Sequence, residues 1–265
     1  MVAPDPWAER EPLVSVRIPT WKGHELLVHR AIPSVLNGLY RNLEVVVCSD
    51  GPDPDARAAV LGVGDPRVRY LELPERPLYP EHRWSFWRTA GTRAVNHALD
   101  GCRGAFIAPL DHDDAFTDDH IPRLLAVARN AQADMVHAQA MMERPAGSWD
   151  VLGRAPLTEG YVTHGSVLYS SRLAAQRMDP DCWLLDEPAD WNMWRRMREL
   201  GASIAFDPHV VLIHFGERTS IGTERKQPIP EELSPAPEVL LADLGRTGLR
   251  WMLDVRLPVA VAAAA

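Results

Sequence analysis

Short apolar runs alternate with longer stretches of helical spacing along the first half of this 265-residue chain. The apolar runs predict β-strands, and the mixed stretches predict α-helices. Strands are expected at residues 13–18, 43–48, 68–73 and 104–110, and helices at 25–39, 55–61 and 88–99. Pro33 is expected to bend or interrupt the first helix. Strands that alternate with helices form β-α-β units, so we predict an α/β fold with a mixed, mostly parallel sheet flanked by helices.

The second half of the chain has a less regular pattern. It predicts helices at 118–130 and 188–200, and strand-like segments at 134–141, 165–169, 202–206 and 210–214. From residue 223 the chain becomes rich in Pro and Glu, which is typical of a linker. A last helix near 237–253 is expected to pack on the body or on a partner, which includes a homodimer. We therefore divide the chain into an N-terminal tail (1–12), one globular domain (13–222) and a linker with a C-terminal helix or tail (223–265).

A cluster of carboxylates follows the strand predicted at 104–110, in the run Asp111-His112-Asp113-Asp114. In parallel α/β sheets, ligands bind outside the carboxyl ends of the strands. Buried charges are costly unless they are paired or bind a metal. An Asp-x-Asp pair offers hard oxygen ligands, which suit Mg²⁺ or Mn²⁺ carrying a phosphorylated substrate. The alternative interpretation is a solvated turn whose Asp caps the next helix.

Three further residues stand where chemistry is expected. Asp50 follows the strand at 43–48 and could accept a hydrogen bond from a base N–H or a ribose hydroxyl, or it could be a simple turn residue in Asp-Gly-Pro. Asp190 begins the helix at 188–200 and could be a general base, or it could complement the helix dipole. His214 follows the run at 210–213 and matters only if the fold brings it to the carboxylates.

A rival interpretation uses some of the same residues. His112 and Asp114 form an H-x-D pair, and with His214 they could make the facial triad of a non-haem iron oxygenase. Arg218 would then hold a 2-oxo acid. Those enzymes are antiparallel β-barrels, whereas this chain alternates helices with apolar strands, so the pattern disfavours them.

Composition narrows the class of protein. The net charge of −8 and the isoelectric point near 5.7 argue against a nucleic-acid partner. The 3 cysteines contain no C-x-x-C pair, which fits a reducing compartment without a disulfide framework or zinc knuckle. Residues 1–12 lack a signal-peptide pattern, and the apolar run at 257–265 is too short for a transmembrane segment. We expect a soluble cytoplasmic protein. Its 9 tryptophans are many, and although most should be core residues, aromatics also line sugar and base sites.

Several stretches, taken in order, resemble motifs of the GT-A fold glycosyltransferases of family 2, over roughly residues 13–220. They are 14–21 (VSVRIPTW), 31–36 (AIPSVL), 43–51 (LEVVVCSDG), 96–99 (NHAL) with 104–114 (GAFIAPLDHDD), 189–197 (ADWNMWRRM) and 211–220 (VLIHFGERTS). The resemblance implies a GT-A, Rossmann-like sheet and a nucleotide-sugar donor that is UDP-, dTDP- or GDP-linked. It also implies a metal-dependent, inverting transfer to an acceptor hydroxyl or amine. The acceptor could be a small molecule, a glycan or a lipid-linked molecule.

The resemblance also implies roles for individual residues. The donor base would be bound by Pro19, Thr20, Trp21 and Asp50. Asp111 would face the ribose or the metal, and the Mn²⁺ or Mg²⁺ ligands would be Asp113 and His214. Arg93 or Arg88 would contact the diphosphate. Asp190 would deprotonate the acceptor. His164, Trp183 and Trp191 are candidate walls of the acceptor pocket.

The chain also departs from the family pattern. Ala189 stands where the family has Glu before the base, Asn192 replaces its second Asp, and Val95 replaces the usual Arg. Asp186 and Glu187 lie just upstream, so the base could be one of them instead of Asp190. A non-catalytic domain that binds a sugar nucleotide or docks a partner on the same fold therefore remains the alternative function.

Overall fold

The nine strands in the described part of the chain form one sheet in the order β3-β2-β1-β4-β8-β6-β9-β5, with β7 paired to β6. A computed structural model describes residues 6–7, 9–144 and 147–216 of the chain. The strands are β1 (Val14–Thr20), β2 (Leu43–Ser49), β3 (Val68–Glu72), β4 (Phe106–Pro109), β5 (Ala115–Phe116), β6 (Met135–Glu143), β7 (Trp149–Leu152), β8 (Val167–Ser170) and β9 (Ile204–His214).

The N-terminal half of the sheet is parallel. β1 pairs in parallel with both β2 and β4, and β2 pairs in parallel with β3. In the other half, β8 is antiparallel to β4 and β6, whereas β6 and β9 are parallel. The carboxyl ends of β1, β2 and β4 therefore meet at one edge, where the sequence places its candidate residues. The predicted mixed, mostly parallel sheet is confirmed.

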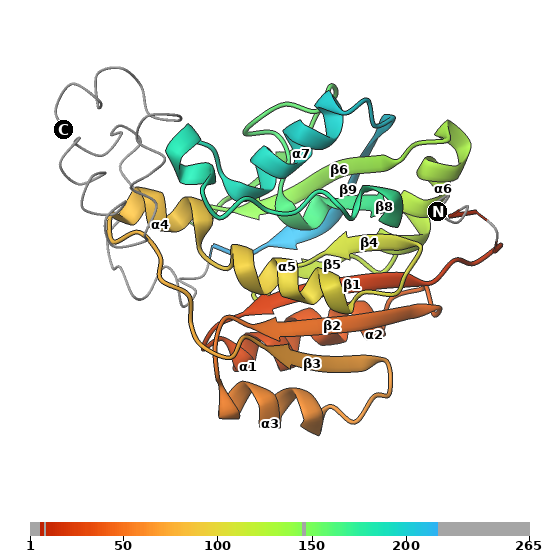
Figure 1. Cartoon of the computed structure of the whole chain (residues 1–265). Coiled ribbons are helices and arrows are strands. Elements are labelled where there is room, and N and C mark those ends of the chain that lie inside the picture. Colours follow the sequence, from red (N-terminus) through yellow and green to blue (C-terminus); the bar gives the residue numbers. More distant parts are fainter. Residues whose placement is uncertain (1–5, 8, 145–146, 217–265) are drawn as a thin grey trace, which may run out of the picture.

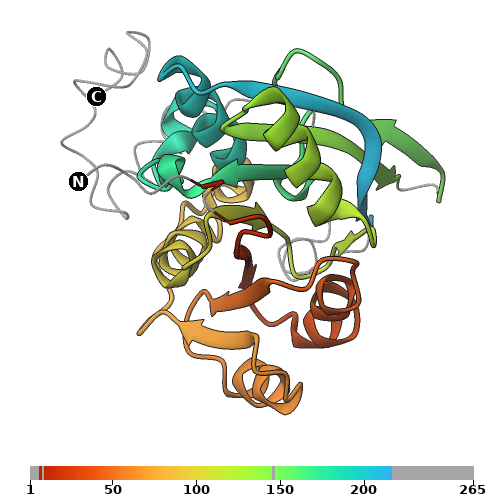
Figure 2. The same ribbon diagram turned by 90° about the vertical axis from the view of Figure 1, so that its right-hand side faces the viewer.

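Helices cover both faces of this sheet (Figures 1 and 2). On one face lie α1 (His24–Leu26), the π-helical turn Leu27–Ala31, α2 (Ile32–Leu36), α3 (Pro54–Gly62) and α6 (His120–Ala131). Their apolar side chains pack on Val14, Val16 and Ile18 in the largest core cluster. On the other face lie α5 (Thr92–Gly101) and α7 (Ala189–Glu199), which enclose a second cluster that contains Trp191 and Trp194. Side chains of β1 point alternately to the two faces and nearly all of them are buried, so the sheet is the middle layer of three.

Two residues, Pro33 and Gly91, interrupt the regular helices that the sequence predicted. A π-helical turn at Leu27–Ala31 precedes Pro33. Proline has no N–H to donate, and its ring clashes with the carbonyl four residues earlier, so the regular helical hydrogen bonds cannot continue there. The helix predicted at 88–99 was wrong in extent. The structure has α4 (Arg83–Thr89), a break at Gly91 with φ of +79°, and then α5. Such a left-handed backbone suits glycine.

Other differences lie in the second half. The strands predicted at 202–206 and 210–214 are one continuous strand, β9, whose pairing with β6 shifts register near Gln139. No helix in the described part of the chain is long and apolar enough to cross a membrane. The linker and last helix expected at 223–265, and the homodimer through that helix, lie outside the described residues. The cytoplasmic location stays a prediction.

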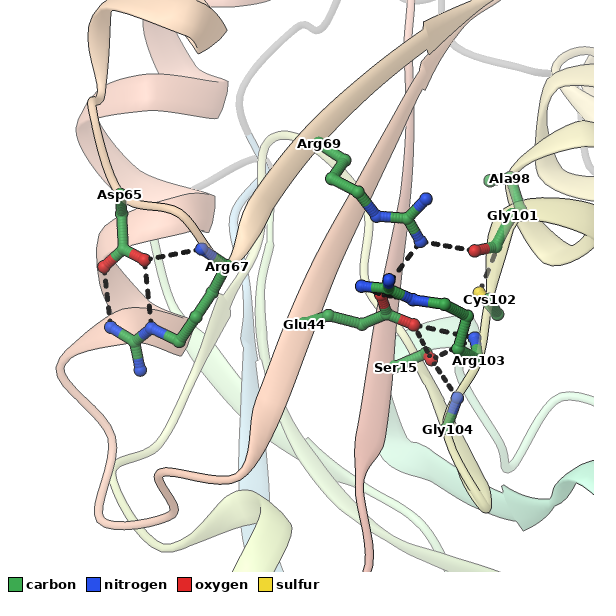
Figure 3. Close-up of polar contacts among 10 residues, drawn as sticks. All are labelled: Ser15, Glu44, Asp65, Arg67, Arg69, Ala98, Gly101, Cys102, Arg103 and Gly104. Atoms are coloured by element: carbon green, nitrogen blue, oxygen red, sulfur yellow. Dashed lines mark hydrogen bonds and ion pairs between the residues drawn. The ribbon is translucent and has the colours of Figure 1, made fainter.

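A buried polar network holds the amino ends of the strands together (Figure 3). Glu44 on β2 is only 3% exposed and accepts hydrogen bonds from Ser15 Oγ at 2.7 Å, Arg69 at 2.8 Å and Arg103 at 2.7 Å. Gly104 donates its N–H to Ser15 Oγ at 2.7 Å. Burial acts to raise the pKa of Glu44, but the hydrogen bonds from Ser15 and Arg103 outweigh it and lower that pKa. The network ties β1, β2, β3 and the start of β4 in register, which also aligns their carboxyl ends.

Candidate functional site

A cavity of about 470 Å³ opens at the carboxyl ends of β1, β2 and β4. Its wall includes most of the residues expected from the sequence, namely Pro19, Thr20, Trp21, Asp50, Asp111, Asp113, His164, Asp190 and His214. They converge because Thr20 ends β1 beside Ser49 at the end of β2, and Asp50 donates its N–H to Thr20 O at 2.9 Å. The fold therefore assembles these residues from six separate segments at one place.

One end of the cavity is built around Asp50, which is 3% exposed. Its Oδ1 accepts a hydrogen bond from the Tyr79 hydroxyl at 2.7 Å, and the Arg76 Nε lies 3.9 Å from its Oδ2. Burial raises the pKa of Asp50 to about 6, although Tyr79 and Arg76 both act to lower it. The Arg76 guanidinium also lies over the Trp21 ring at 4.4 Å. This end can hold a flat ring and accept its N–H groups.

No pattern in the sequence pointed to Arg76 or Tyr79, because they lie in a Pro-rich connection without periodicity. Tyr79 is nevertheless fixed from two sides, since Gly91 donates its N–H to the Tyr79 hydroxyl at 3.1 Å. The left-handed Gly91 thereby links the start of α5 to the Asp50 end of the cavity.

The carboxylate cluster is organised by two histidines. His164 Nδ1 lies 2.9 Å from Asp111 Oδ1, and His214 Nδ1 lies 3.0 Å from Asp114 Oδ2. Burial acts to raise the pKa of Asp111, but His164, His214 and His112 hold it at about 2. Burial acts to lower the pKa of His214, but Asp114 and its neighbours raise it to about 9. Burial raises the pKa of Asp113.

These residues can be tested for their fit to a divalent metal. Among the described residues no three ligand side chains are already grouped around one point. Mg²⁺ and Mn²⁺ sites that carry phosphorylated substrates often use only one or two protein carboxylates, with phosphate oxygens completing the shell. The bond from Asp114 to His214 Nδ1 is the carboxylate–imidazole pair that orients a metal-binding histidine, and it leaves Nε2 free to bind. Asp113 and His214 both line the cavity, so the donor set fits.

The iron-oxygenase interpretation is wrong. The fold is a mixed α/β sheet between helix layers, not an antiparallel barrel. Asp114 uses one carboxylate oxygen on His214 and the other on the Phe215 N–H at 3.3 Å. The His112 ring packs on Gly23, where an added Cβ would lie 2.2 Å from its atoms. Arg218 lies outside the described residues.

The three candidate general bases near the start of α7 differ in their hydrogen-bond and ion-pair partners. Glu187 binds Arg195 at 2.7 Å and accepts from Asn192 Nδ2 at 2.6 Å. Asp186 pairs with Arg88 and is largely exposed. Asp190 lines the cavity, and its Oδ1 accepts a hydrogen bond from the Trp191 N–H at 2.8 Å. Burial raises the pKa of Asp190, which favours proton uptake. Of the three, Asp190 has the position of a base.

Three expected site residues do not lie on the cavity wall. Trp183 and Trp191 are 3% and 7% exposed, and Trp191 is part of the core cluster under α7. Arg93 on α5 is exposed and absent from the wall, although its charge still acts to lower the pKa of Asp50. Both tryptophans were expected as walls of the acceptor pocket, but both are buried and neither lines the cavity. His164 does line the cavity, with its Nε2 buried and unpartnered within the described part of the chain.

The cavity wall includes residues that sequence reasoning missed. Arg76 and Arg83 lie there beside Arg88, which the sequence did suggest for the diphosphate. Trp87 also lies on the wall and is 42% exposed. Both Arg83 and Trp87 belong to α4, which the periodicity did not predict before residue 88. The unusual number of tryptophans was the one available signal.

Comparisons with known proteins agree with this geometry. The model of the family described as glycosyltransferase like family 2 matches residues 11–229. The Escherichia coli chondroitin synthase is 25% identical over 211 residues, which are 73% of this chain and 27% of that protein. The chain thus spans about a quarter of that relative.

Two solved structures share the fold. Staphylococcus aureus TarS 1–349 in complex with UDP-GlcNAc has a TM-score of 0.57 at 12% identity, covering 90% of this chain and 66% of TarS 1–349. The mannosyltransferase PcManGT from Pyrobaculum calidifontis, in complex with GDP-Man and Mn²⁺, has a TM-score of 0.58 at 17% identity, covering 99% and 80%. At these identities the likeness shows the fold alone, and it is the GT-A fold that the sequence predicted.

Proposed function

The chain belongs to glycosyltransferase family 2, and on that premise we propose a metal-dependent, inverting transfer of a sugar from a nucleoside-diphosphate donor to an acceptor hydroxyl or amine. The observation that carries this proposal is that Asp50, Asp113 and Asp190 line one cavity. In this proposal Asp50 binds the nucleobase and Asp113 binds the metal. The partly buried Asp190 takes the proton of the acceptor.

The donor base is proposed to bind at the Asp50 end. The Asp50 carboxylate can accept a ring N–H, such as those of uracil, thymine or guanine, and its position is fixed by the Tyr79 hydroxyl. Trp21 supplies a flat face, with Arg76 over it. A UDP-, dTDP- or GDP-linked donor fits this chemistry.

The diphosphate is proposed to lie between the carboxylate cluster and the arginines of α4. Asp113 and His214 Nε2 would hold Mn²⁺ or Mg²⁺, which supplies Lewis-acid neutralisation of the charge that develops on the leaving diphosphate. Asp114 keeps His214 oriented through its Nδ1, and Arg83 and Arg88 add positive charge to the same wall. PcManGT binds GDP-Man with Mn²⁺, which supports this arrangement.

Asp190 is proposed to act as the general base. Its carboxylate takes the proton from the acceptor hydroxyl while the acceptor oxygen forms a bond to the anomeric carbon. The bond from that carbon to the diphosphate oxygen breaks, and its electron pair leaves with the nucleoside diphosphate. A single in-line displacement of this kind inverts the anomeric configuration. A general base contributes about 10²–10⁴-fold to such a rate.

The departures from the family pattern at Ala189 and Asn192 are consistent with this role. Glu187 accepts hydrogen bonds from the Asn192 amide and the Arg195 guanidinium, so it stabilises the first turn of α7 and does not face the cavity. Asp190→Asn should therefore reduce transfer by about 10²-fold or more. Glu187→Gln is the matched control because it removes a candidate carboxylate that binds Arg195 and does not line the cavity.

The test uses the donor and acceptor that the wild type turns over best in a panel of UDP-, dTDP- and GDP-sugars with sugar acceptors. We expect Asp190→Asn to bind donor like the wild type and to lose transfer, while Glu187→Gln keeps most of it. Unchanged transfer by Asp190→Asn, or loss confined to Glu187→Gln, would remove Asp190 as the base. The anomeric configuration of the product, read by NMR, tests inversion.

A further inference from the structure

An exposed tryptophan on the cavity wall has no place in the donor site described above. Trp87 in α4 is 42% exposed and lines the cavity. Its ring stacks on that of Trp84, with centroids 5.1 Å apart and planes inclined by 18°. The Arg88 guanidinium lies over Trp84 at 4.3 Å. Trp87 therefore stacks on Trp84, which itself contacts Arg88, and these contacts restrict the orientation of the Trp87 indole.

Two contacts connect α4, which carries Trp87, to the segment that leads into α7 and Asp190. Arg88 pairs with Asp186, four residues before Asp190. Thr89 Oγ1 donates to Pro180 O at 2.6 Å, which also ties α4 to the segment that leads into α7. A neighbouring residue of α4, Phe86, packs edge-on to Tyr79 at 5.7 Å and so serves the base end. Among the described residues the ring contact of Trp87 is with Trp84, and its exposed side chain lines the cavity.

We propose that Trp87 is a stacking platform for a sugar ring of the acceptor, which makes the acceptor a carbohydrate. This inference rests on the proposed transfer and names its acceptor class. A pyranose has a flat face of C–H groups that packs on an aromatic ring, and a rim of hydroxyls that needs donors and acceptors. Asp186 is 60% exposed and pairs with Arg88, the residue that follows Trp87 in α4, so a hydrogen-bond acceptor lies near this helix.

The mixed charges favour a sugar over a lipid surface. A membrane-binding patch joins apolar side chains to basic ones, because lipid headgroups are anionic. Here the basic Arg83 and Arg88 of α4 are accompanied by the acidic Asp186, which pairs with Arg88. Sugar hydroxyls carry no charge and can form hydrogen bonds with either Arg88 or Asp186. The fixed stack under Trp87 also suits a rigid ring better than a mobile acyl chain.

The test measures binding of defined sugars by saturation-transfer NMR with Mg²⁺ and the nucleotide that stabilises the protein. The probes are the methyl β-glycosides of glucose, galactose, N-acetylglucosamine and N-acetylgalactosamine, with their β-linked disaccharides. We expect at least one probe to bind the wild type, and Trp87→Ala to weaken it at least tenfold. Trp87→Phe should stay within about threefold of the wild type, because it keeps an aromatic face.

Trp149→Ala is the matched control, since Trp149 is 43% exposed but lies on β7 and not on the cavity wall. It should bind the probes like the wild type. Equal binding by Trp87→Ala, equal loss in Trp149→Ala, or no probe bound by the wild type would each overturn the inference.

A nucleotide thermal-shift assay separates this inference from the proposed function. Trp87→Ala should keep the wild-type shift, which also shows that it folds. If Trp87→Ala loses the shift, Trp87 belongs to the nucleotide site and the inference fails. A wild-type shift without sugar binding overturns the inference and leaves the proposed function standing. Sugar binding that depends on Trp87, without any nucleotide shift, supports the platform and contradicts the proposed donor.

Discussion

Asp50→Asn should make the protein more stable at neutral pH while weakening nucleotide binding. Burial raises the pKa of Asp50 from 3.8 to about 6, so the folded state favours its protonated form. Between these two values the folded state binds more protons than the unfolded state, and the free energy of unfolding falls as pH rises. Above pH 6 the ionised carboxylate costs the folded protein on the order of 3 kcal/mol as an upper bound, at about 1.4 kcal/mol for each pH unit.

The assay is urea unfolding of the wild type and Asp50→Asn from pH 4 to pH 8. Asparagine is neutral at every pH and can still accept the Tyr79 hydrogen bond, so the variant should lack the loss of stability that Asp50 causes. We expect the variant to gain relative to the wild type as pH rises, by about 1–3 kcal/mol at pH 8. Asp55→Asn is the control for removing a surface carboxylate, because Asp55 is exposed in the first turn of α3.

A difference between Asp50→Asn and the wild type that is constant with pH would refute this reasoning. So would a variant that loses relative stability as pH rises. Nucleotide affinity of Asp50→Asn should fall at pH 8, because the variant lacks a charged acceptor for the base N–H.

The other predictions concern the Glu44 network, the metal site and the contact between Gly23 and His112. Glu44→Gln should lower the free energy of unfolding by about 1–3 kcal/mol, because the charged acceptor for Arg69 and Arg103 is lost; urea unfolding measures this, and an unchanged midpoint would contradict it. Asp114→Asn should weaken Mn²⁺ binding by about 10–100-fold in the presence of nucleotide, because Asp114 orients His214; calorimetric titration checks it, and unaltered affinity would oppose the assignment. Gly23→Ala should displace the His112 ring, since its Cβ would lie 2.2 Å from that ring, and lower the melting temperature; a wild-type melting curve would show that the contact is not tight.

Strand positions and carboxylate positions were predictable from the sequence. The runs that became β1, β2 and β4 are apolar because both sheet faces are covered, and the residues after them must meet at one edge. Asp50 and the residues from Asp111 to Asp114 could be placed from that rule alone. His214 required the pairing of β6 with β9, which links distant segments and leaves no local pattern.

The acceptor side could not be predicted in the same way. Trp191 stands next to Asp190 in sequence, but on a helix adjacent side chains point about 100° apart, so one faces the cavity and the other the core. Trp87 belongs to a short helix set off by Gly91, and neither its boundaries nor its exposed face has an apolar period. Arg76 and Tyr79 lie in an irregular connection. Their positions depend on tertiary contacts, which local spacing does not encode.

The central claim is that the cavity binds a nucleoside-diphosphate sugar through a metal held by Asp113 and His214. Its most direct test is a thermal-shift panel of UDP-, dTDP- and GDP-sugars, with and without Mn²⁺, on the wild type and Asp113→Asn. One nucleotide class should stabilise the wild type only with Mn²⁺, by about 2.7 kcal/mol at a ligand concentration 100 times Kd. Asp113→Asn should lose that stabilisation. No shift with any nucleotide, or an equal shift in Asp113→Asn, would contradict the account.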